Sequence, residues 1–275
     1  MYLVDSLRSR GRENFPVALR ILPAAVRSDL LAIYGYARYV DDLGDVGVGD
    51  RVKALHSVRS DVLALYDGGA AAHPAVTALR PTIERHQIPK EPLLRLVDAN
   101  LMDQEVTRYP TFDDLLGYCR LSANPVGELV LHIFGENTDD TIALSDRVCT
   151  GLQLIEHWQD VAEDRANGRI YLPQEDLRRF GVGESDLDQP VATASVRSLI
   201  AFETDRALCW LDAGAYLVSA LHGWARLAVS GYVAGGRAAA AELGRHDFDP
   251  MSGVAKPGAR KILSTWLRAS VRSPG

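Results

Sequence analysis

The chain has few cysteines and no long apolar run. Its three cysteines, Cys119, Cys149 and Cys209, are widely spaced, so the 275-residue sequence predicts neither a disulfide framework nor a CxxC zinc site. Apolar stretches such as residues 215–221 end well short of the roughly 20 residues that cross a bilayer. Because the N-terminal residues also lack the features of a secretory signal, we expect a cytoplasmic protein that is not integral to a membrane.

Several binding signatures are also missing. A net charge of −6 without a long basic run argues against a dedicated nucleic-acid surface. The histidines show no HExxH spacing, and the chain has no GxGxxG fingerprint or glycine-rich phosphate loop. We therefore expect no nucleic-acid partner and no NADPH site.

Alternating β-branched segments are scarce, whereas apolar residues recur at helical spacing almost throughout, as at Leu30, Ile33, Ala37 and Val40. With 47% hydrophobic residues, the sequence predicts an all-α protein with a sizeable core. No joint resembles a flexible linker, so residues 1–275 are expected to form one domain. The predicted helices span residues 17–22, 24–46, 51–66, 74–86, 91–107, 112–134, 139–167, 194–221, 223–243 and 259–268.

One acidic pair stands out in residues 37–45. Asp41 and Asp45 lie one turn apart on the same face of a predicted helix, and Asp42 is turned about 100° away. Like charges at this spacing destabilise an isolated helix, so the pair needs a cation or a solvated location. Carboxylate oxygens suit Mg²⁺, which is often shared with substrate phosphate oxygens. A single pair is nevertheless more often a solvated helix face, because the chain has 36 acidic residues.

A second pair, Asp160 and Asp164, lies in another long predicted helix with apolar stretches. Both pairs are therefore positioned to line a shared interior cavity. Such an arrangement would bind a diphosphate through metal ions, withdraw charge from the leaving group and let a C–O bond ionise.

Two ordered signatures surround these aspartates. The first comprises Asn14-Phe15, Leu22-Pro23, Arg27, Tyr34, Arg38 and Asp41-Asp-x-x-Asp45. The second comprises Gln153, Asp160-x-x-x-Asp164, Gly168-Arg169 and Tyr171-Leu-Pro173. Together they resemble the squalene/phytoene synthase family over nearly the whole chain.

The resemblance implies a single-domain isoprenoid synthase bundle around a central cavity, with two or three Mg²⁺ ions and a lipid diphosphate substrate. It assigns the metal ligands to Asp41, Asp45, Asp160 and Asp164. Arg38 and Arg169 would contact diphosphate, although an ion pair with a neighbouring aspartate is the alternative for each. Gln153 is expected to serve the site rather than the core.

The resemblance also suggests residues for the cavity wall. Phe15, Tyr171 and Tyr232 are expected to bind substrate, and the faces of Tyr118 and Tyr232 to stabilise a passing cation, unless they are ordinary core aromatics. Asp103 matches another family position, and we expect it to be structural more often than catalytic. His157 is expected to pack or to lie at the surface rather than to bind metal.

The segment 118–127, Tyr-Cys-Arg-Leu-Ser-Ala-Asn-Pro-Val-Gly, resembles the hydroxysqualene synthase branch of bacterial hopanoid pathways, as do residues 13–18 and Trp158-Gln159. That branch ionises presqualene diphosphate and traps the rearranged cation with water. Pro125 would bend or interrupt a helix. Asn124 would then either position a water as a catalytic residue or belong to a structural kink.

Two residues depart from the family pattern. Glu156 stands where the family generally has Asn, and it would either join the metal ligands or reshape the site. Gln159 replaces an Arg that is common in phytoene and squalene synthases, which removes one cation; the hydroxysqualene branch tolerates this change.

Three functions remain open from the sequence. The first is conversion of presqualene diphosphate to hydroxysqualene, with any later reduction left to a separate flavin or nicotinamide enzyme. The second is head-to-head condensation of prenyl diphosphates such as farnesyl diphosphate to presqualene diphosphate, squalene or phytoene. The third is a non-catalytic helical assembly subunit, against which the two intact acidic pairs argue. Lipid substrates also predict a peripheral contact with the inner face of a membrane.

Overall fold

The structure is a computed structural model that describes residues 22–45 and 49–252. These residues form helices and no β-strand, apart from an isolated parallel bridge between Arg108 and Ile170. The all-α prediction is confirmed. Within this part of the chain no helix combines the length and the apolar character that a bilayer span requires. Phe15, the predicted helix 259–268 and all but the last residue of the predicted helix 17–22 lie outside the described residues.

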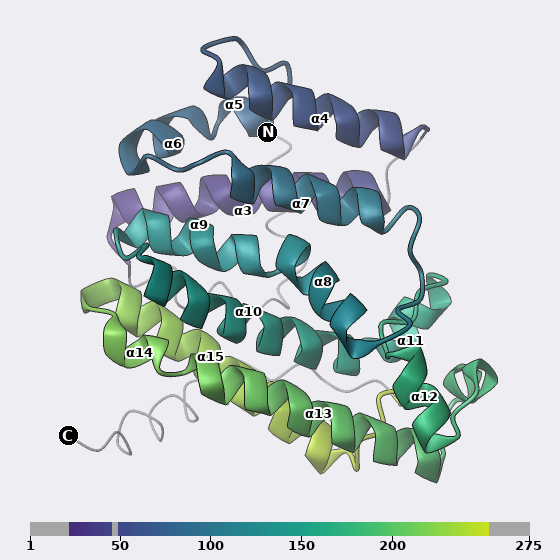
Figure 1. Cartoon of the computed structure of the whole chain (residues 1–275). Helices are drawn as coiled ribbons and strands as arrows, with labels where there is room; N and C mark the ends of the chain where they lie inside the picture. Colours follow the sequence, from purple (N-terminus) through teal and green to yellow (C-terminus); the bar gives the residue numbers. More distant parts are fainter. Residues whose placement is uncertain (1–21, 46–48, 253–275) are drawn as a thin grey trace.

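The helices lie side by side in layers (Figure 1), with α3 and α7 above α10, and α13 and α15 below it. The long helices are α3 (Ala24–Asp45), α4 (Arg51–Tyr66), α7 (Glu91–Met102), α8 (Phe112–Ser122), α9 (Asn124–Phe134), α10 (Asp139–Gln159), α13 (Ala194–Gly214) and α15 (Gly223–Arg245). The short ones are α5 (Pro74–Thr77), α6 (Arg80–His86), α11 (Val161–Ala166), α12 (Gln174–Phe180), the 3₁₀ helix η1 (Glu184–Asp188) and α14 (Leu217–Ala220).

Two hydrophobic cores hold these layers together. One lies among α3, α4, α7 and α9 and contains Tyr36, Val40, Leu55, Leu93 and Leu129. The other lies among α8, α10, α13 and α15 and contains Leu131, Leu154, Trp158, Leu211 and Val233. Because α9 contributes buried residues to both, it joins the upper layers to the lower ones.

Two helices predicted as continuous are interrupted. Segment 112–134 divides into α8 and α9 at Ala123, since Pro125 in the first turn of α9 has no amide hydrogen to continue the preceding helix. The interruption expected at Pro125 is thus confirmed. Segment 139–167 divides into α10 and α11 at Asp160, whose φ of −101° and ψ of 15° depart from helical values. The prediction of one helix carrying both Asp160 and Asp164 was wrong.

The other differences are two more divided helices, one helix that ends early and two short helices that were not predicted. Segment 74–86 divides into α5 and α6, and segment 194–221 into α13 and α14. The helix predicted for 91–107 ends at Met102, because the chain then turns to place Arg108 beside Ile170. Helix α12 and η1 were not predicted; they are short, and η1 is held by ion pairs to Arg108 and Arg165 rather than by an apolar stripe.

Glycines allow α10 and α13 to approach closely. A Cβ atom added at Gly151 would lie 2.7 Å from the backbone nitrogen of Leu211, and one added at Gly214 would lie 2.6 Å from that of Val148. Backbone atoms cannot move aside as a flexible side chain can. The spacing of these two helices, which positions the C-terminal end of α10, therefore depends on hydrogen in place of a side chain at both positions.

We predict that Gly151→Ala lowers the free energy of unfolding by about 1–3 kcal/mol, the usual cost of overpacking. Gly231→Ala, on α15, is the matched control, because its added methyl group would meet no atom of a neighbouring element within 4 Å. That change should be neutral or stabilising, since Ala has the better helix propensity by about 1 kcal/mol. Urea denaturation of both variants measures the difference, and equal stability of the two would contradict the close approach.

Candidate active site

The two acidic pairs belong to one end of the bundle, where α3 ends and α11 lies (Figure 1, right). Asp41 and Asp45 stand in the last turns of α3, whereas Asp160 and Asp164 follow the end of α10. The Asp45 Oδ1 and Arg169 Nη1 atoms form an ion pair of 2.8 Å across 124 residues of sequence. Arg169 thus connects the first motif with the segment that follows the second.

Asp41 is held by a partner that the motifs did not include. Its Oδ1 accepts a hydrogen bond of 3.0 Å from Nδ2 of Asn100 on α7. This contact needs Gly44, because a side chain at that position would collide with the side-chain oxygen of Asn100, Oδ1. Although the Asp41 side chain is exposed, enough protein surrounds it that desolvation, together with the charge of Asp45, raises its pKa to about 6. The charge of Asp41 is therefore poorly compensated.

Both predicted diphosphate-binding arginines are ion-paired. Arg38 lies 3.1 Å from Asp42 one turn along α3, and Arg169 pairs with Asp45. Burial disfavours the charge of Arg169, but Asp45 and Asp103 nevertheless hold its pKa above the ordinary value. For both arginines the structure therefore shows an ion pair with an aspartate, which was the alternative to diphosphate binding. A diphosphate would compete with these carboxylates for the same guanidinium groups.

A buried aromatic cluster stands behind the acidic end. The Asp103 carboxylate accepts hydrogen bonds of 2.7 Å from the Tyr118 hydroxyl and 3.2 Å from the Tyr171 hydroxyl. Burial raises the pKa of Asp103, and it also raises the pKa of Tyr118. The Tyr109 ring centroid lies 5.7 Å from those of both other tyrosines. Asp103 thus fixes the ring positions of two residues predicted to face substrate.

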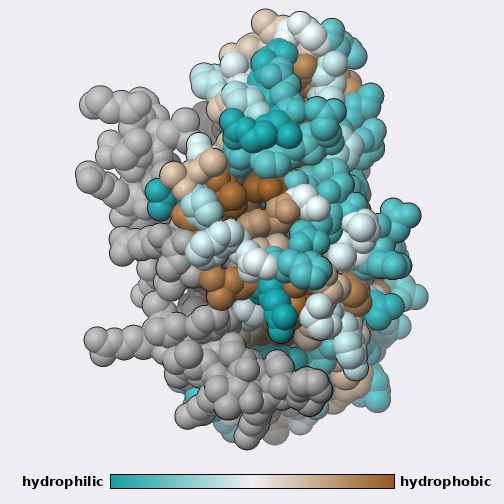
Figure 2. Space-filling model, turned by 90° about the vertical axis from the view of Figure 1, so that its left-hand side faces the viewer, coloured by the Kyte–Doolittle hydropathy of each residue, from teal (hydrophilic) through white to brown (hydrophobic). Residues whose placement is uncertain are grey.

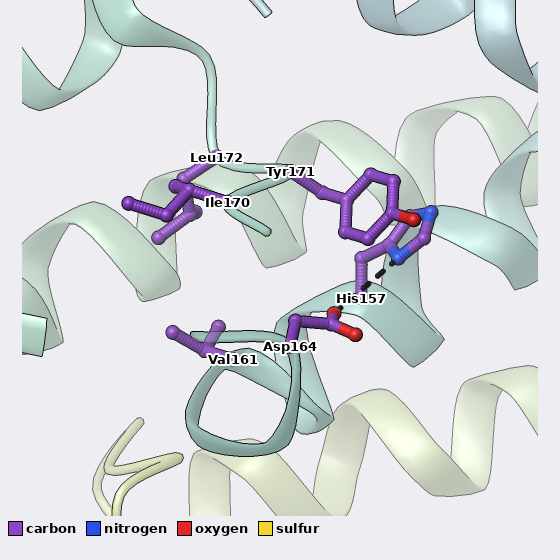
Figure 3. Close-up of a pocket in the computed structure, with 6 residues that line it drawn as sticks. All are labelled: His157, Val161, Asp164, Ile170, Tyr171 and Leu172. Carbon is purple, nitrogen blue, oxygen red and sulfur yellow. Dashed lines mark ion pairs between the residues drawn. The ribbon is translucent and has the colours of Figure 1, made fainter. Parts of the chain in front are cut away.

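A small pocket opens between α10, α11 and the chain that follows them (Figure 3). Its lining residues are His157, Val161, Asp164, Ile170, Tyr171 and Leu172. The His157 ring stacks on Tyr171 with centroids 3.8 Å apart, and its Nδ1 atom lies 3.8 Å from Asp164 Oδ2. His157 is 7% exposed, which agrees with the predicted packing role, but its ring also faces Asp164, a predicted metal ligand.

Other predicted site residues are placed differently. Asn124 is buried, and its Oδ1 accepts a hydrogen bond of 3.0 Å from the Thr150 hydroxyl, which ties α9 to α10. Tyr232 is partly buried on α15 and packs against the lower core. Glu156 is exposed on α10. The side chain of Gln159 is buried, and its amide nitrogen has no hydrogen-bond partner among the residues that the structure describes.

The acidic end suits a hard cation in its chemistry. Its donors are carboxylate oxygens, which Mg²⁺ prefers, and a divalent cation would relieve the poorly compensated charge of Asp41. Within residues 22–45 and 49–252 no three acidic, histidine or cysteine side chains are close enough to form a metal cluster. In this arrangement Arg169 supplies the positive charge that Asp45 faces.

Asn100 contacts a predicted site residue, Asp41, but belongs to neither sequence motif. The available signal is the row of polar residues Asn100, Asp103 and Gln104, spaced as one helix face at the end of an apolar helix. Gln104 extends the same contact by donating to the carbonyl oxygens of Gly44 and Asn100 at 3.2 and 3.0 Å. Polar residues near the end of α7 and directly after it thus support the end of α3.

Comparison with known proteins identifies the family. The family model described as squalene/phytoene synthase matches residues 8–266. The chain belongs to the squalene/phytoene synthase family. The predicted resemblance is confirmed, and family membership identifies an enzyme of isoprenoid synthesis.

Relatives within the squalene/phytoene synthase family carry different reaction names. The chain is 30% identical to the phytoene synthase of Mycobacterium tuberculosis, over 78% of this chain and 72% of that protein. It is 34% identical to the hydroxysqualene synthase of Zymomonas mobilis, over 68% and 64% respectively. The crystal structure of squalene synthase HpnC from Alicyclobacillus acidocaldarius matches with a TM-score of 0.82 at 40% identity, covering 90% of this chain and 92% of that one. The likeness to the hopanoid branch is thereby supported.

We predict that the stability of Asp41→Asn relative to wild type increases as pH rises. The pKa of Asp41 is about 6 in the folded protein, above its ordinary value of 3.8, so the native state loses stability from this group as pH rises toward 6. Without divalent cations, the melting temperature of Asp41→Asn relative to wild type should therefore increase from pH 4 to pH 7.5.

Mg²⁺ should raise the melting temperature of the wild type at pH 7.5 and that of Asp41→Asn much less. Asp42→Asn, which alters a neighbouring carboxylate on another face of α3, is the control and should keep the response to Mg²⁺. A pH-independent difference between wild type and Asp41→Asn would contradict the raised pKa.

Proposed function

We propose that the chain converts presqualene diphosphate and water to hydroxysqualene and diphosphate. The observation that carries the chemistry is that both acidic pairs belong to one end of the bundle, linked through Arg169, with a buried aromatic cluster beside them. The choice of reaction rests on residues 118–127 and on the likeness to the Zymomonas mobilis hydroxysqualene synthase.

The acidic end would bind the diphosphate group. Asp41, Asp45, Asp160 and Asp164, with Glu156 as an additional candidate, would hold two or three Mg²⁺ ions, which neutralise the charge of the leaving group when bound. Arg38 and Arg169 would exchange their aspartate partners for diphosphate oxygens, which offer more negative charge and bidentate geometry. Asn100 would keep the Asp41 carboxylate oriented through this exchange.

The aromatic cluster would act on the hydrocarbon part of the substrate. The C–O bond breaks with its electron pair leaving on diphosphate, and the face of Tyr118 stabilises the carbocation, whereas the Tyr171 ring is stacked on His157. The buried Asp103 carboxylate adds negative potential behind both rings. Water then adds its oxygen to the rearranged cation and releases one proton, which leaves the alcohol and diphosphate as products.

The position of Asn124 favours a structural role over the positioning of that water. Its side-chain oxygen already accepts a hydrogen bond from Thr150, and the side chain is buried between α9 and α10. Asn124 and Pro125 would then shape the cavity by setting the angle at which α9 begins.

Head-to-head condensation of two prenyl diphosphates is the second candidate. The observation in its favour is the phytoene synthase relative, which aligns over more of the chain than the hydroxysqualene synthase does. Ionisation of a diphosphate by the same residues would begin either reaction.

The two reactions are separated by incubating the purified protein and Mg²⁺ with presqualene, farnesyl or geranylgeranyl diphosphate, each alone. We expect hydroxysqualene from presqualene diphosphate, with its hydroxyl oxygen labelled in ¹⁸O-water, and no product from the other two. Product from farnesyl or geranylgeranyl diphosphate alone would overturn the assignment. The variant Asp41→Asn/Asp160→Asn should keep its helical circular dichroism and release no diphosphate, whereas full activity would remove these residues from the mechanism.

We further propose that the opposite end of the molecule contacts a membrane surface, from which a lipid substrate would enter. Figure 2 shows this end, where hydrophobic side chains gather in the middle of the face, with hydrophilic side chains above them and to their right. Helix α14 lies at the same end (Figure 1), and Tyr216 and Trp224 beside it are 73% and 44% exposed. Both aromatic residues suit the boundary between headgroups and hydrocarbon.

Tyr216→Ser/Trp224→Ser should therefore reduce the fraction of protein that floats with phosphatidylcholine vesicles in a density gradient. Val191→Ser is the control, because Val191 is also an exposed apolar residue, at 56%, but precedes the start of α13 at the other end. Equal flotation of wild type and the double variant would argue against this contact.

A further inference from the structure

His157 is a buried polar residue at the acidic end that the proposed reaction does not use. It lies on α10, three residues before Asp160, and its ring is in contact with other side chains on three sides (Figure 3 shows two of them). Tyr171 stacks against the ring at an interplanar angle of 17°. Asp164 faces Nδ1, and the Gln153 amide lies at Nε2. Mere packing would not require a polar group at both nitrogens.

The contact with Gln153 selects one form of the imidazole. The Gln153 Nε2 atom lies 3.1 Å from His157 Nε2, and an amide nitrogen can only donate a hydrogen bond. With the amide in this orientation the histidine Nε2 accepts, which leaves the proton of the neutral ring on Nδ1. The Nδ1 atom lies 3.8 Å from Asp164 Oδ2, a separation longer than a hydrogen bond but short enough for electrostatic attraction.

Asp164 has few other restraints. It belongs to α11, a helix of six residues that begins after the interruption at Asp160. Its backbone is held, because its amide donates to the Asp160 carbonyl at 2.8 Å and its carbonyl accepts from the Arg169 amide at 2.9 Å. Among the described residues, His157 is the side chain that pairs with its carboxylate. The orientation of that carboxylate therefore depends on His157.

We propose that His157 is a positioning residue for Asp164. Its Nδ1–H group attracts one carboxylate oxygen and would leave the other to bind a cation, while Gln153 sets the tautomer and Tyr171 fixes the plane of the ring. The inference rests on the proposed function, because it assumes that Asp164 binds a cation. Groups that orient metal ligands in this way commonly change metal affinity 10- to 100-fold when they are removed.

Two substitutions separate positioning from packing. His157→Phe keeps a flat ring against Tyr171 but removes the donor, whereas His157→Asn places an amide N–H near the position of Nδ1 but loses the stacked ring. Positioning predicts that Phe weakens cation binding about 10- to 100-fold and that Asn retains it to within about threefold. Packing alone predicts the reverse order, with Asn the more damaging change.

The measurement is a Mn²⁺ titration followed by electron paramagnetic resonance, with inorganic diphosphate present and substrate absent. Wild type, Asp164→Asn and both His157 variants are compared, and a thermal melt of each reports its folding. Weak binding by His157→Phe at an unchanged melting temperature, with binding retained by His157→Asn, supports the proposal. Unchanged binding by His157→Phe together with weak binding by Asp164→Asn overturns the role of His157 but leaves the proposed metal role of Asp164 intact. If Asp164→Asn binds Mn²⁺ as wild type does, the proposed metal role of Asp164 and this inference fail together.

Discussion

Negative charge gathered at one end of a helical bundle is the constraint on which the arrangement of this site depends. Asp45 forms an ion pair with Arg169, whereas Asp41 accepts a hydrogen bond from the neutral amide of Asn100. Desolvation by the surrounding protein, together with the charge of Asp45, raises the pKa of Asp41 despite the hydrogen bond from Asn100. A site of this kind favours a divalent cation, and a substrate that brings its own negative charge arrives together with that cation.

The packing of the helices that carry these carboxylates keeps the carboxylates in place. Gly44 makes room for Asn100, and Gly151 lets α10 approach α13 so closely that the end of α10 has a defined position. The interruption at Asp160 then separates the two carboxylates of the second motif between a helix end and the short α11. Since α11 itself is small, Asp164 relies on contacts from α10, of which His157 is the clearest.

Much of the fold was predictable from local sequence. Helix α3 begins at its predicted first residue, and α4 matches its prediction because Asp50 caps the first turn by accepting from the Lys53 amide. The break at Asp160 was not predictable in the same way, since no Gly or Pro marks it and the turn depends on tertiary contacts. Helix α12 was missed because seven residues with a charged surface carry little periodicity.

The site was predictable in its motifs but not in its partners. The acidic pairs and Arg169 follow from the family signatures, and the structure places Arg169 against Asp45. Asn100 and His157 lie outside the residues assigned to those signatures, and each reaches its aspartate only after helices distant in sequence or separated by a break have packed. Polar residues at helical spacing indicate a polar helix face, but tertiary packing decides which residues that face contacts.

The central claim is that both acidic pairs bind one diphosphate through divalent cations. A crystal structure with Mn²⁺ and a non-ionisable thiodiphosphate analogue of the substrate tests it most directly. The account predicts anomalous scattering peaks coordinated by carboxylates from both pairs, with Arg169 turned from Asp45 to the diphosphate. A diphosphate bound elsewhere, with the Asp45–Arg169 ion pair intact and no Mn²⁺ at either pair, would contradict it.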